Sequence, residues 1–412
     1  MKTTSRCGYG AVWRIACAAL LALALGTAAA AQPIKIGVIA PAAHIDGRAI
    51  MQAAELATQQ INANGGIDGR PVKLIKYDDH GSSSDAVRAY QRAVQKDHVV
   101  AVTGIFISEV ALALEPWTGR LKTPLIDTGA ATTEITKRIH DHYASHKYMF
   151  QEFTNSNFLA RGVCDSGKDI FVKDLGYKTA VVLSENAAWT KPVDAEYKKC
   201  LPKIGLKVLD TIVFSPDTND FSPIFNKIEG LHPDVILTAI AHVGVKPTVQ
   251  WHQDQVPILL AGISGQAGSS AFWKATNGAS AGVITTSTGA NGAALTPKTK
   301  PFFDAYKKAF NEEPAYDAYT TYDSLYTLKA AIERAGTTQA DKLVSALEKT
   351  DQEGVEGHIQ FYGRHARYTH GLKYGKGLVT GVAFQWQHGQ QVVIWPKRIA
   401  QGKPVLPDFV KQ

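Results

Sequence analysis

Apolar residues along the chain alternate between short runs and helically spaced positions. Residues 34–40 (IKIGVIA) form a short β-branched run, which is typical of a buried strand. Residues 48–63 then carry small and branched apolar side chains three or four positions apart, as on one face of a helix. The pattern predicts that a strand and a helix follow one another here.

Residues 61–79 (INANGGIDGRPVKLIKYDD) interrupt this pattern with three glycines and a proline. The helix should end at Asn64-Gly65, because glycine adopts left-handed backbone angles without a Cβ penalty. Turns at Gly66, Gly69 and Pro71 then lead into an alternating strand. No GxGxxG opens a helix in this stretch and no P-loop lysine follows it. We therefore interpret these glycines as scaffold and not as a phosphate-binding loop.

The alternation continues along the rest of the chain. Predicted strands are 34–40, 72–79, 99–103, 124–127, 179–184, 207–213, 234–239 and 257–261, with strand-like pieces at 357–361, 379–386 and 390–395. Predicted helices are 48–63, 85–97, 108–119, 157–175, 191–204, 220–229, 246–254, 298–310 and 316–335. Such alternation predicts an α/β fold with two doubly wound parallel-sheet lobes. Ligands of such sheets bind beyond the carboxyl ends of the strands, in the loops after residues 40, 104, 128, 184, 240 and 261.

Residues 1–31 differ from the rest of the chain. Lys2, Arg6 and Arg14 are basic, no acid occurs before Asp46, and an apolar run ends in alanines. This is the pattern of a cleaved secretory signal peptide. The run is shorter than the roughly 20 residues of a membrane-spanning helix, so we expect a periplasmic product; an uncleaved anchor is the alternative.

Charge and cysteine content narrow the possible classes. Without the three basic residues of the signal, the 44 basic and 37 acidic residues leave a formal net charge of +4. A surplus this small gives no reason to expect a nucleic-acid partner. Two cysteines remain after cleavage, Cys164 and Cys200. One pair in an exported chain favours a disulfide; two buried free thiols are the alternative.

Metal and catalytic motifs are weak. His140, His142 and His146 have a spacing that could bind zinc, but we interpret this polar stretch as a solvated surface. The segment 262–266 (GISGQ) ends in Gln266, where a nucleophile elbow needs glycine. We therefore expect that the protein is not an enzyme and that it binds neither a cofactor nor a metal ion.

The pattern IN-x-x-GGI-x-G-x-x-V-x-L-x-x-x-DD of residues 61–79 resembles the periplasmic leucine/branched-chain amino-acid-binding family. The stretches IKIGVIAP, VVAVTG, TPLIDTGAATTEIT, NDFSPIFNKI and YTTYDSLYTLKAAIERAG extend the resemblance over essentially the whole mature chain. It implies the type I fold, whose two lobes are joined by three crossings, here expected near 150–154, 281–290 and 354–358. Lobe 1 would comprise 32–152 plus 285–355, and lobe 2 would comprise 153–284 plus 356–412. The resemblance also implies a monomer that delivers a small-molecule ligand to an ABC permease of the inner membrane.

The resemblance places one ligand contact at a helix start. Ile107 and Ser108 follow a strand and open a helix, where a ligand carboxylate can accept backbone N–H bonds. The alternative for Ser108 is a plain N-cap.

Two further segments align with family ligand loops. Gly129, Ala130, Ala131 and Thr132 match the second ligand loop, where small residues let a ligand approach the backbone; a capping turn is the alternative. Trp189 aligns with an aromatic residue that closes over the ligand; packing on the following helix is its alternative.

The chain departs from the family at residues 262–266. Family members that bind amino acids place a glutamate about here, whereas Ser264 and Gln266 are neutral. Burial of an ammonium without a paired charge costs several kcal/mol. Asp46 could be a displaced ammonium partner, and Asp317 stands in place of a family aromatic residue.

These departures favour a small carboxylate as the ligand, with aromatic acids among the candidates. A branched-chain or other amino acid is the alternative, and so is an amide or urea-like solute bound by a sensor.

Overall fold

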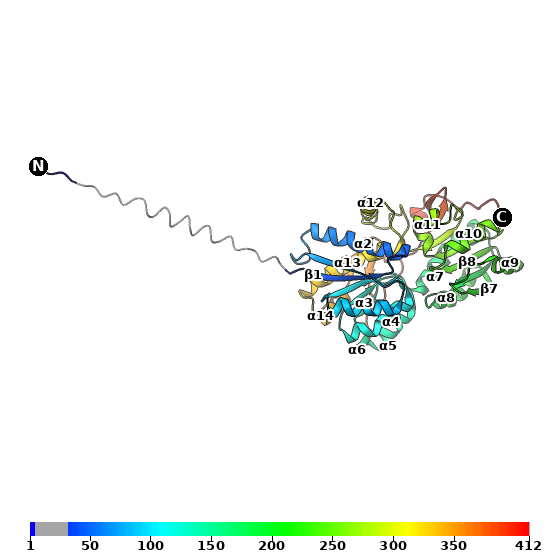
Figure 1. Ribbon diagram of the computed structural model, residues 1–412. Coiled ribbons are helices and arrows are strands. Elements are labelled where there is room, and N and C mark those ends of the chain that lie inside the picture. Colours follow the sequence, from blue (N-terminus) through cyan, green and yellow to red (C-terminus); the bar gives the residue numbers. More distant parts are fainter. Residues whose placement is uncertain (5–31, 412) are drawn as a thin grey trace.

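The computed structural model describes residues 1–4 and 32–411. Residues 5–31 of the predicted signal peptide, and residue 412, lie outside the described residues. Figure 1 shows two lobes side by side, the first coloured mainly blue to cyan and the second mainly green.

The first lobe is built on a parallel sheet with strand order β2-β1-β3-β4-β5. Its strands are β1 (Ile34–Ala40), β2 (Val72–Asp78), β3 (Ala101–Gly104), β4 (Leu125–Asp127) and β5 (Met149–Gln151). Its helices are α2 (Ile45–Ala63), α3 (Ser83–Gln95), α4 (Ser108–Arg120), α5 (Thr133–Asp141), α6 (Tyr143–His146), α12 (Thr299–Phe310), α13 (Tyr316–Ala335) and α14 (Ala340–Leu347). Ile39 and Val102 pack toward α3 and α4, whereas Ile36 and Val38 pack toward α2 and α13. Both faces of the sheet are therefore covered, as a parallel sheet requires.

The second lobe contains a parallel sheet of order β7-β6-β8-β9 and a neighbouring antiparallel sheet of order β10-β13-β14. Its strands are β6 (Thr179–Glu185), β7 (Lys207–Phe214), β8 (Val235–Ile240), β9 (Leu259–Ser264), β10 (Ile284–Ser287), β13 (Val382–Gln387) and β14 (Gln390–Trp395). Its helical segments are α7 (Ser156–Gly167), the π-helix η1 (Lys168–Asp174), α8 (Thr190–Ile204), α9 (Ser222–Gly230), α10 (Val245–Gln253), η2 (Gln266–Gly268), α11 (Ala271–Ala275) and η3 (Lys397–Ile399). The predicted α/β class with two doubly wound lobes is confirmed.

The glycines of the hairpin after α2 are required by its backbone conformation. Gly65, Gly66 and Gly69 all have positive φ angles, of 91°, 77° and 73°. A Cβ atom at Gly66 would lie 2.0 Å from the carbonyl oxygen of Arg70. These residues answer a conformational need of the turn.

The lobe boundaries differ from the expected ones at two places. Strand β10 pairs with β13, so the second crossing follows residue 287 and does not begin at 285. Strand β12 (His358–Gln360) pairs with β11 (Asp351–Glu353), and Gln151 of β5 exchanges backbone hydrogen bonds with His370 and Leu372. The segment 357–373 therefore lies on the edge of the first lobe, and the third crossing comes after it. A contact between residues more than 200 positions apart is not visible in local periodicity.

Three buried carboxyl groups lie near the first two crossings. Glu152 directly follows β5 and accepts a hydrogen bond from the Thr327 hydroxyl at 3.0 Å. Glu356 accepts from the hydroxyls of Thr288 and Thr320 at 2.9 and 3.0 Å. Asp323 accepts from the backbone N–H of Val355 at 2.7 Å.

Burial raises the pKa of each of these carboxyls, to about 7 for Asp323 and about 8 for Glu356. The charge of Asp323 adds to the increase for Glu152 and Glu356. The folded protein therefore holds protons here that the unfolded chain would release at lower pH.

We predict that this cluster makes the protein less stable as the pH rises from about 4.5 to 8. Carboxyls whose pKa is raised by folding stabilise the protein fully below their unfolded pKa, and this stability is lost as pH rises through the folded pKa. The slope is up to about 1.4 kcal/mol per pH unit for each group. Urea denaturation of Glu356→Gln at pH 5 and pH 8 should show a shallower dependence than wild type. Glu353→Gln, which changes an exposed carboxyl, is the control; equal slopes for all three proteins would contradict the prediction.

Cys164 of α7 and Cys200 of α8 form a disulfide, with 6.1 Å between their Cα atoms. The bond joins two positions 36 residues apart. It holds together two helices that pack against each other beside β6.

We predict that reduction of this disulfide lowers the free energy of unfolding by about 2–4 kcal/mol, because the unfolded chain regains the freedom of the closed loop. Urea denaturation with and without a reducing agent measures the difference. The Cys164→Ala/Cys200→Ala double variant should be as unstable as the reduced protein and insensitive to reductant. A reductant effect in that variant would assign the loss to another cause.

Candidate functional site

A small cleft lies between the two lobes. The first lobe contributes Phe106, Ser108, Gly129, Ala131 and Tyr316. The first crossing and the second lobe contribute Phe153, Leu159, Trp189, Ala241, His242, Ile263, Ser264, Gly265, Thr286 and Ser287. The walls are formed by the loops at the carboxyl ends of the strands, as expected for doubly wound sheets.

Of the predicted first ligand loop, one residue reaches the cleft. Ser108 is the first residue of α4 and lines the cleft, whereas Ile107 is the N-cap residue and lies outside the lining. The Ser108 hydroxyl accepts a hydrogen bond from the backbone N–H of Thr132 at 3.2 Å. The two predicted ligand loops of the first lobe are therefore bonded to each other.

The second loop is held by a buried carboxylate. Asp127 accepts hydrogen bonds from the backbone N–H groups of Gly129 and Ala130, at 3.2 and 2.8 Å. Gly129 and Ala131 line the cleft, and Ala130 and Thr132 do not. Thr132 caps α5 and donates to the carbonyl of Ala188 in the second lobe at 3.3 Å. Thr132 therefore forms part of the contact between the two lobes.

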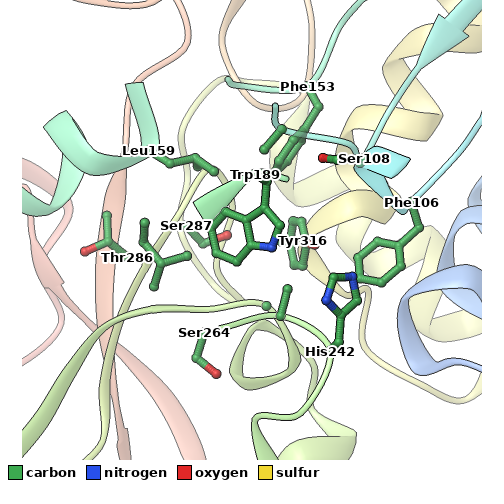
Figure 2. A pocket seen from close by; sticks show the side chains of 15 residues that line it. Phe106, Ser108, Phe153, Leu159, Trp189, His242, Ser264, Thr286, Ser287 and Tyr316 are labelled. Carbon is green, nitrogen blue, oxygen red and sulfur yellow. The ribbon is translucent and has the colours of Figure 1, made fainter. Parts of the chain in front are cut away.

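Aromatic rings form much of the cleft wall. Figure 2 shows the indole of Trp189 at the centre of the lining, with Phe153 and Tyr316 near it. The rings of Phe153 and Tyr316 have centroids 5.5 Å apart. The Trp189 N–H donates to Glu185 at 2.9 Å, so its orientation is fixed before any ligand arrives.

Neither His242 nor Glu185 is among the predicted site residues. His242 follows β8 and lines the cleft, and its Nδ1 lies 2.6 Å from Oε1 of Glu185. Glu185 is completely buried at the end of β6. Both residues could have been found from their positions at strand ends, because the loops after residues 184 and 240 were predicted to face the ligand.

The two residues form an ion pair. Burial raises the pKa of Glu185, but the hydrogen bond and charge of His242 outweigh it, and the net pKa is lowered. Burial likewise lowers the pKa of His242, but Glu185 reverses this and the net pKa is raised. Glu185 thereby favours the protonated form of His242. Among the 15 lining residues, none is an aspartate or glutamate.

Ser264 and Gln266 have different surroundings. Ser264 lines the cleft, and its buried hydroxyl has no hydrogen-bond partner within residues 32–411. Gln266 lies outside the lining: its amide accepts from the N–H of Val245 at 3.0 Å and donates to the carbonyl of His242 at 3.2 Å. The expectation of a direct ligand contact at Gln266 therefore finds no support, because its polar atoms hold the His242 loop.

Asp46 and Asp317 also lie outside the lining. Both are buried; burial raises the pKa of Asp46 to about 7 and that of Asp317 well above its usual range. Tyr316, the residue before Asp317, lines the cleft in its place. A helix turns by about 100° per residue, so a one-residue difference decides which side chain faces the ligand.

Within the described part of the chain, no group of three or more His, Cys, Asp or Glu residues is placed to hold a metal ion. Over the same residues, no helix combines the length and apolarity needed to cross a membrane.

Comparison with known proteins identifies the family. Residues 33–376 match the sequence profile of the periplasmic binding protein family. Leu/Ile/Val-binding protein homolog 7 of Brucella suis is 24% identical over 94% of this chain and 97% of its own length. A branched-chain amino acid transporter substrate binding protein, LivJ from Streptococcus pneumoniae in complex with isoleucine, superimposes with a TM-score of 0.75 at 22% identity, over 89% of this chain and all of its own. A solute binding protein of an ABC transporter from R. palustris in complex with benzoate gives 0.74 at 18% identity, over 92% and 99%. The family match spans most of the sequence, and this protein therefore belongs to the periplasmic binding protein family.

Proposed function

We propose that this protein captures a small carboxylate, with aromatic acids among the candidates, and delivers it to an ABC permease. The observation that carries the proposal is the charge of the cleft: its lining contains the cationic His242 and no aspartate or glutamate. An amino-acid ligand would place its ammonium among uncharged groups near this cation, which is costly in a desolvated site.

The walls support a flat or branched apolar body for the ligand. Trp189, Phe106, Phe153 and Tyr316 provide ring faces and edges, and Leu159 and Ile263 provide aliphatic surface. Aromatic rings pack well against both kinds of surface. The solved R. palustris protein carries benzoate, which shows that this fold accommodates an aromatic carboxylate.

A branched-chain amino acid is the second candidate. The named relatives bind leucine, isoleucine and valine or resemble proteins that do. Oδ1 of Asp46 is buried without a hydrogen-bond partner in the described chain, and the charge of Asp46 acts on His242. A rearranged cleft that exposed Asp46 would supply an ammonium partner.

Ala188 of the second lobe makes two hydrogen bonds to the first lobe, and these support a closed arrangement of the lobes. Its backbone N–H donates to the carboxylate of Glu109 at 2.7 Å, and its carbonyl accepts from the Thr132 hydroxyl at 3.3 Å. Both partners belong to the first lobe. Such contacts form only when the lobes meet, as in hinge closure around a ligand.

We predict that carboxylates without an amine raise the melting temperature of the mature protein, and that leucine does not. The protein is first unfolded and refolded to remove bound ligand, then mixed with benzoate, hydroxybenzoates, hydroxycinnamates, aliphatic acids, leucine, isoleucine, phenylalanine, urea and short amides. A ligand at 100 times its dissociation constant adds about 2.7 kcal/mol of stability. Stabilisation by leucine alone would overturn the carboxylate assignment in favour of the amino-acid candidate.

We also predict that Glu109→Ala weakens the binding of whichever ligand the panel identifies by roughly five- to ten-fold, because one hydrogen bond of the closed form, worth about 1 kcal/mol, is lost. The loss should lie in the dissociation rate, measured by stopped-flow tryptophan fluorescence. Glu134→Ala removes another exposed carboxylate of the first lobe, and this variant should bind as wild type does. Equal dissociation rates for both variants would show that Ala188 does not hold the closed form.

A further inference from the structure

We propose that His242 is the residue that selects the ligand's charge, pairing through its free Nε2 with the ligand carboxylate while Glu185 positions it. This inference rests on the proposed carboxylate function and names the group responsible for it.

The geometry leaves one donor of His242 for the cleft. Nδ1 is engaged by Glu185 at 2.6 Å, and Nε2 makes no hydrogen bond within residues 32–411. The His242 side chain is 18% exposed, whereas that of Glu185 is 0% exposed. His242 is one of the residues that line the cleft. Figure 2 shows this ring beside Phe106, whose centroid lies 5.7 Å away in an edge-to-face arrangement.

Glu185 is a positioning residue and not a ligand contact. Its Oε1 takes Nδ1 of His242 and the indole N–H of Trp189, and its Oε2 accepts from the backbone N–H groups of Ala241 and His242. Both oxygens are therefore occupied, so this buried acid has no free position for a ligand ammonium. The same carboxylate orients the cation and the aromatic wall.

Gln266 supports the arrangement from the other side. Its amide bonds the carbonyl of His242 and the N–H of Val245, which fixes the turn that carries the imidazole. A carboxylate at position 266 could accept from Val245 but could not donate to the His242 carbonyl. It would also place a second negative charge beside the cation, and thereby reduce its attraction for an anionic ligand.

Charged groups on four elements act on His242. Glu185 of β6, Glu109 of α4 and Asp46 of α2 favour the cation, whereas burial disfavours it. His44, in the turn before α2, is the like-charged neighbour, and its own pKa is lowered by burial and by His242. Tyr316 of α13 lines the same cleft. The net pKa of His242 lies above the ordinary 6.5. Affinity for a carboxylate should therefore fall as pH rises through this raised pKa.

The experiment compares ligands of the same shape that differ in charge. Isothermal titration calorimetry measures the refolded protein with benzoate against benzamide, and with 3-methylbutanoate against 3-methylbutanamide. Wild type should bind at least one acid roughly ten- to hundred-fold more tightly than its amide, the range expected for a charged hydrogen bond. In His242→Gln this preference should largely disappear. His365→Gln, an exposed histidine on the first lobe, should retain it.

The wild-type pH profile provides a measurement that needs no variant. Between pH 6 and pH 9 both acids stay ionised, so weaker acid binding with unchanged amide binding reports the loss of the His242 proton. Glu185→Gln should shift this loss to lower pH, which a merely structural role would not do.

Acid preference that survives in His242→Gln, or that is constant from pH 6 to 9, overturns the inference and leaves the carboxylate function standing. Failure of every carboxylate to bind wild type overturns both.

Discussion

The buried carboxylate of Glu185 is the interaction on which the cleft depends. It ties the end of β6 to the start of α8 through Trp189, and to the loop after β8 through Ala241 and His242. A desolvated carboxylate is costly unless it is paired and hydrogen-bonded. Here one cation and three N–H donors meet that condition, so loss of any partner would leave charge uncompensated. The second-lobe wall is consequently organised before a ligand binds.

Buried acids are also found where the lobes connect. Glu152, Asp323 and Glu356 lie near the first two crossings and accept hydrogen bonds from threonine hydroxyls and a backbone N–H group. The protein thus places buried acids in two settings: the pKa of Glu185 in the cleft is lowered by its partners, whereas the pKa values of Glu152, Asp323 and Glu356 are raised by burial.

The fold could be predicted because periodicity and turn residues are local signals. Strand and helix patterns from Ile34 to Trp395 located the two doubly wound lobes, and the strand-end rule located the ligand loops. The third crossing could not be placed, because residues 370–372 join β5 through contacts with no local trace. Side-chain direction was harder still. Asp317 was named where Tyr316 faces the cleft, and Gln266 where its amide turns to the backbone.

The predicted contacts at Asp317 and Gln266 differ from the structure for the same physical reason, and this reason also concerns which charged groups face the ligand. A polar side chain near a predicted site suggests a ligand contact, yet backbone groups of the loops compete for the same atoms. The amide of Gln266 is bonded to the His242 loop, and Asp317 is buried, which raises its pKa. We infer that the charge facing the ligand is set by the groups that the loops leave unbonded, and Nε2 of His242 makes no hydrogen bond within residues 32–411. In this receptor the neutral residue at 266 and the cation at 242 are parts of one arrangement, because the first holds the loop that presents the second.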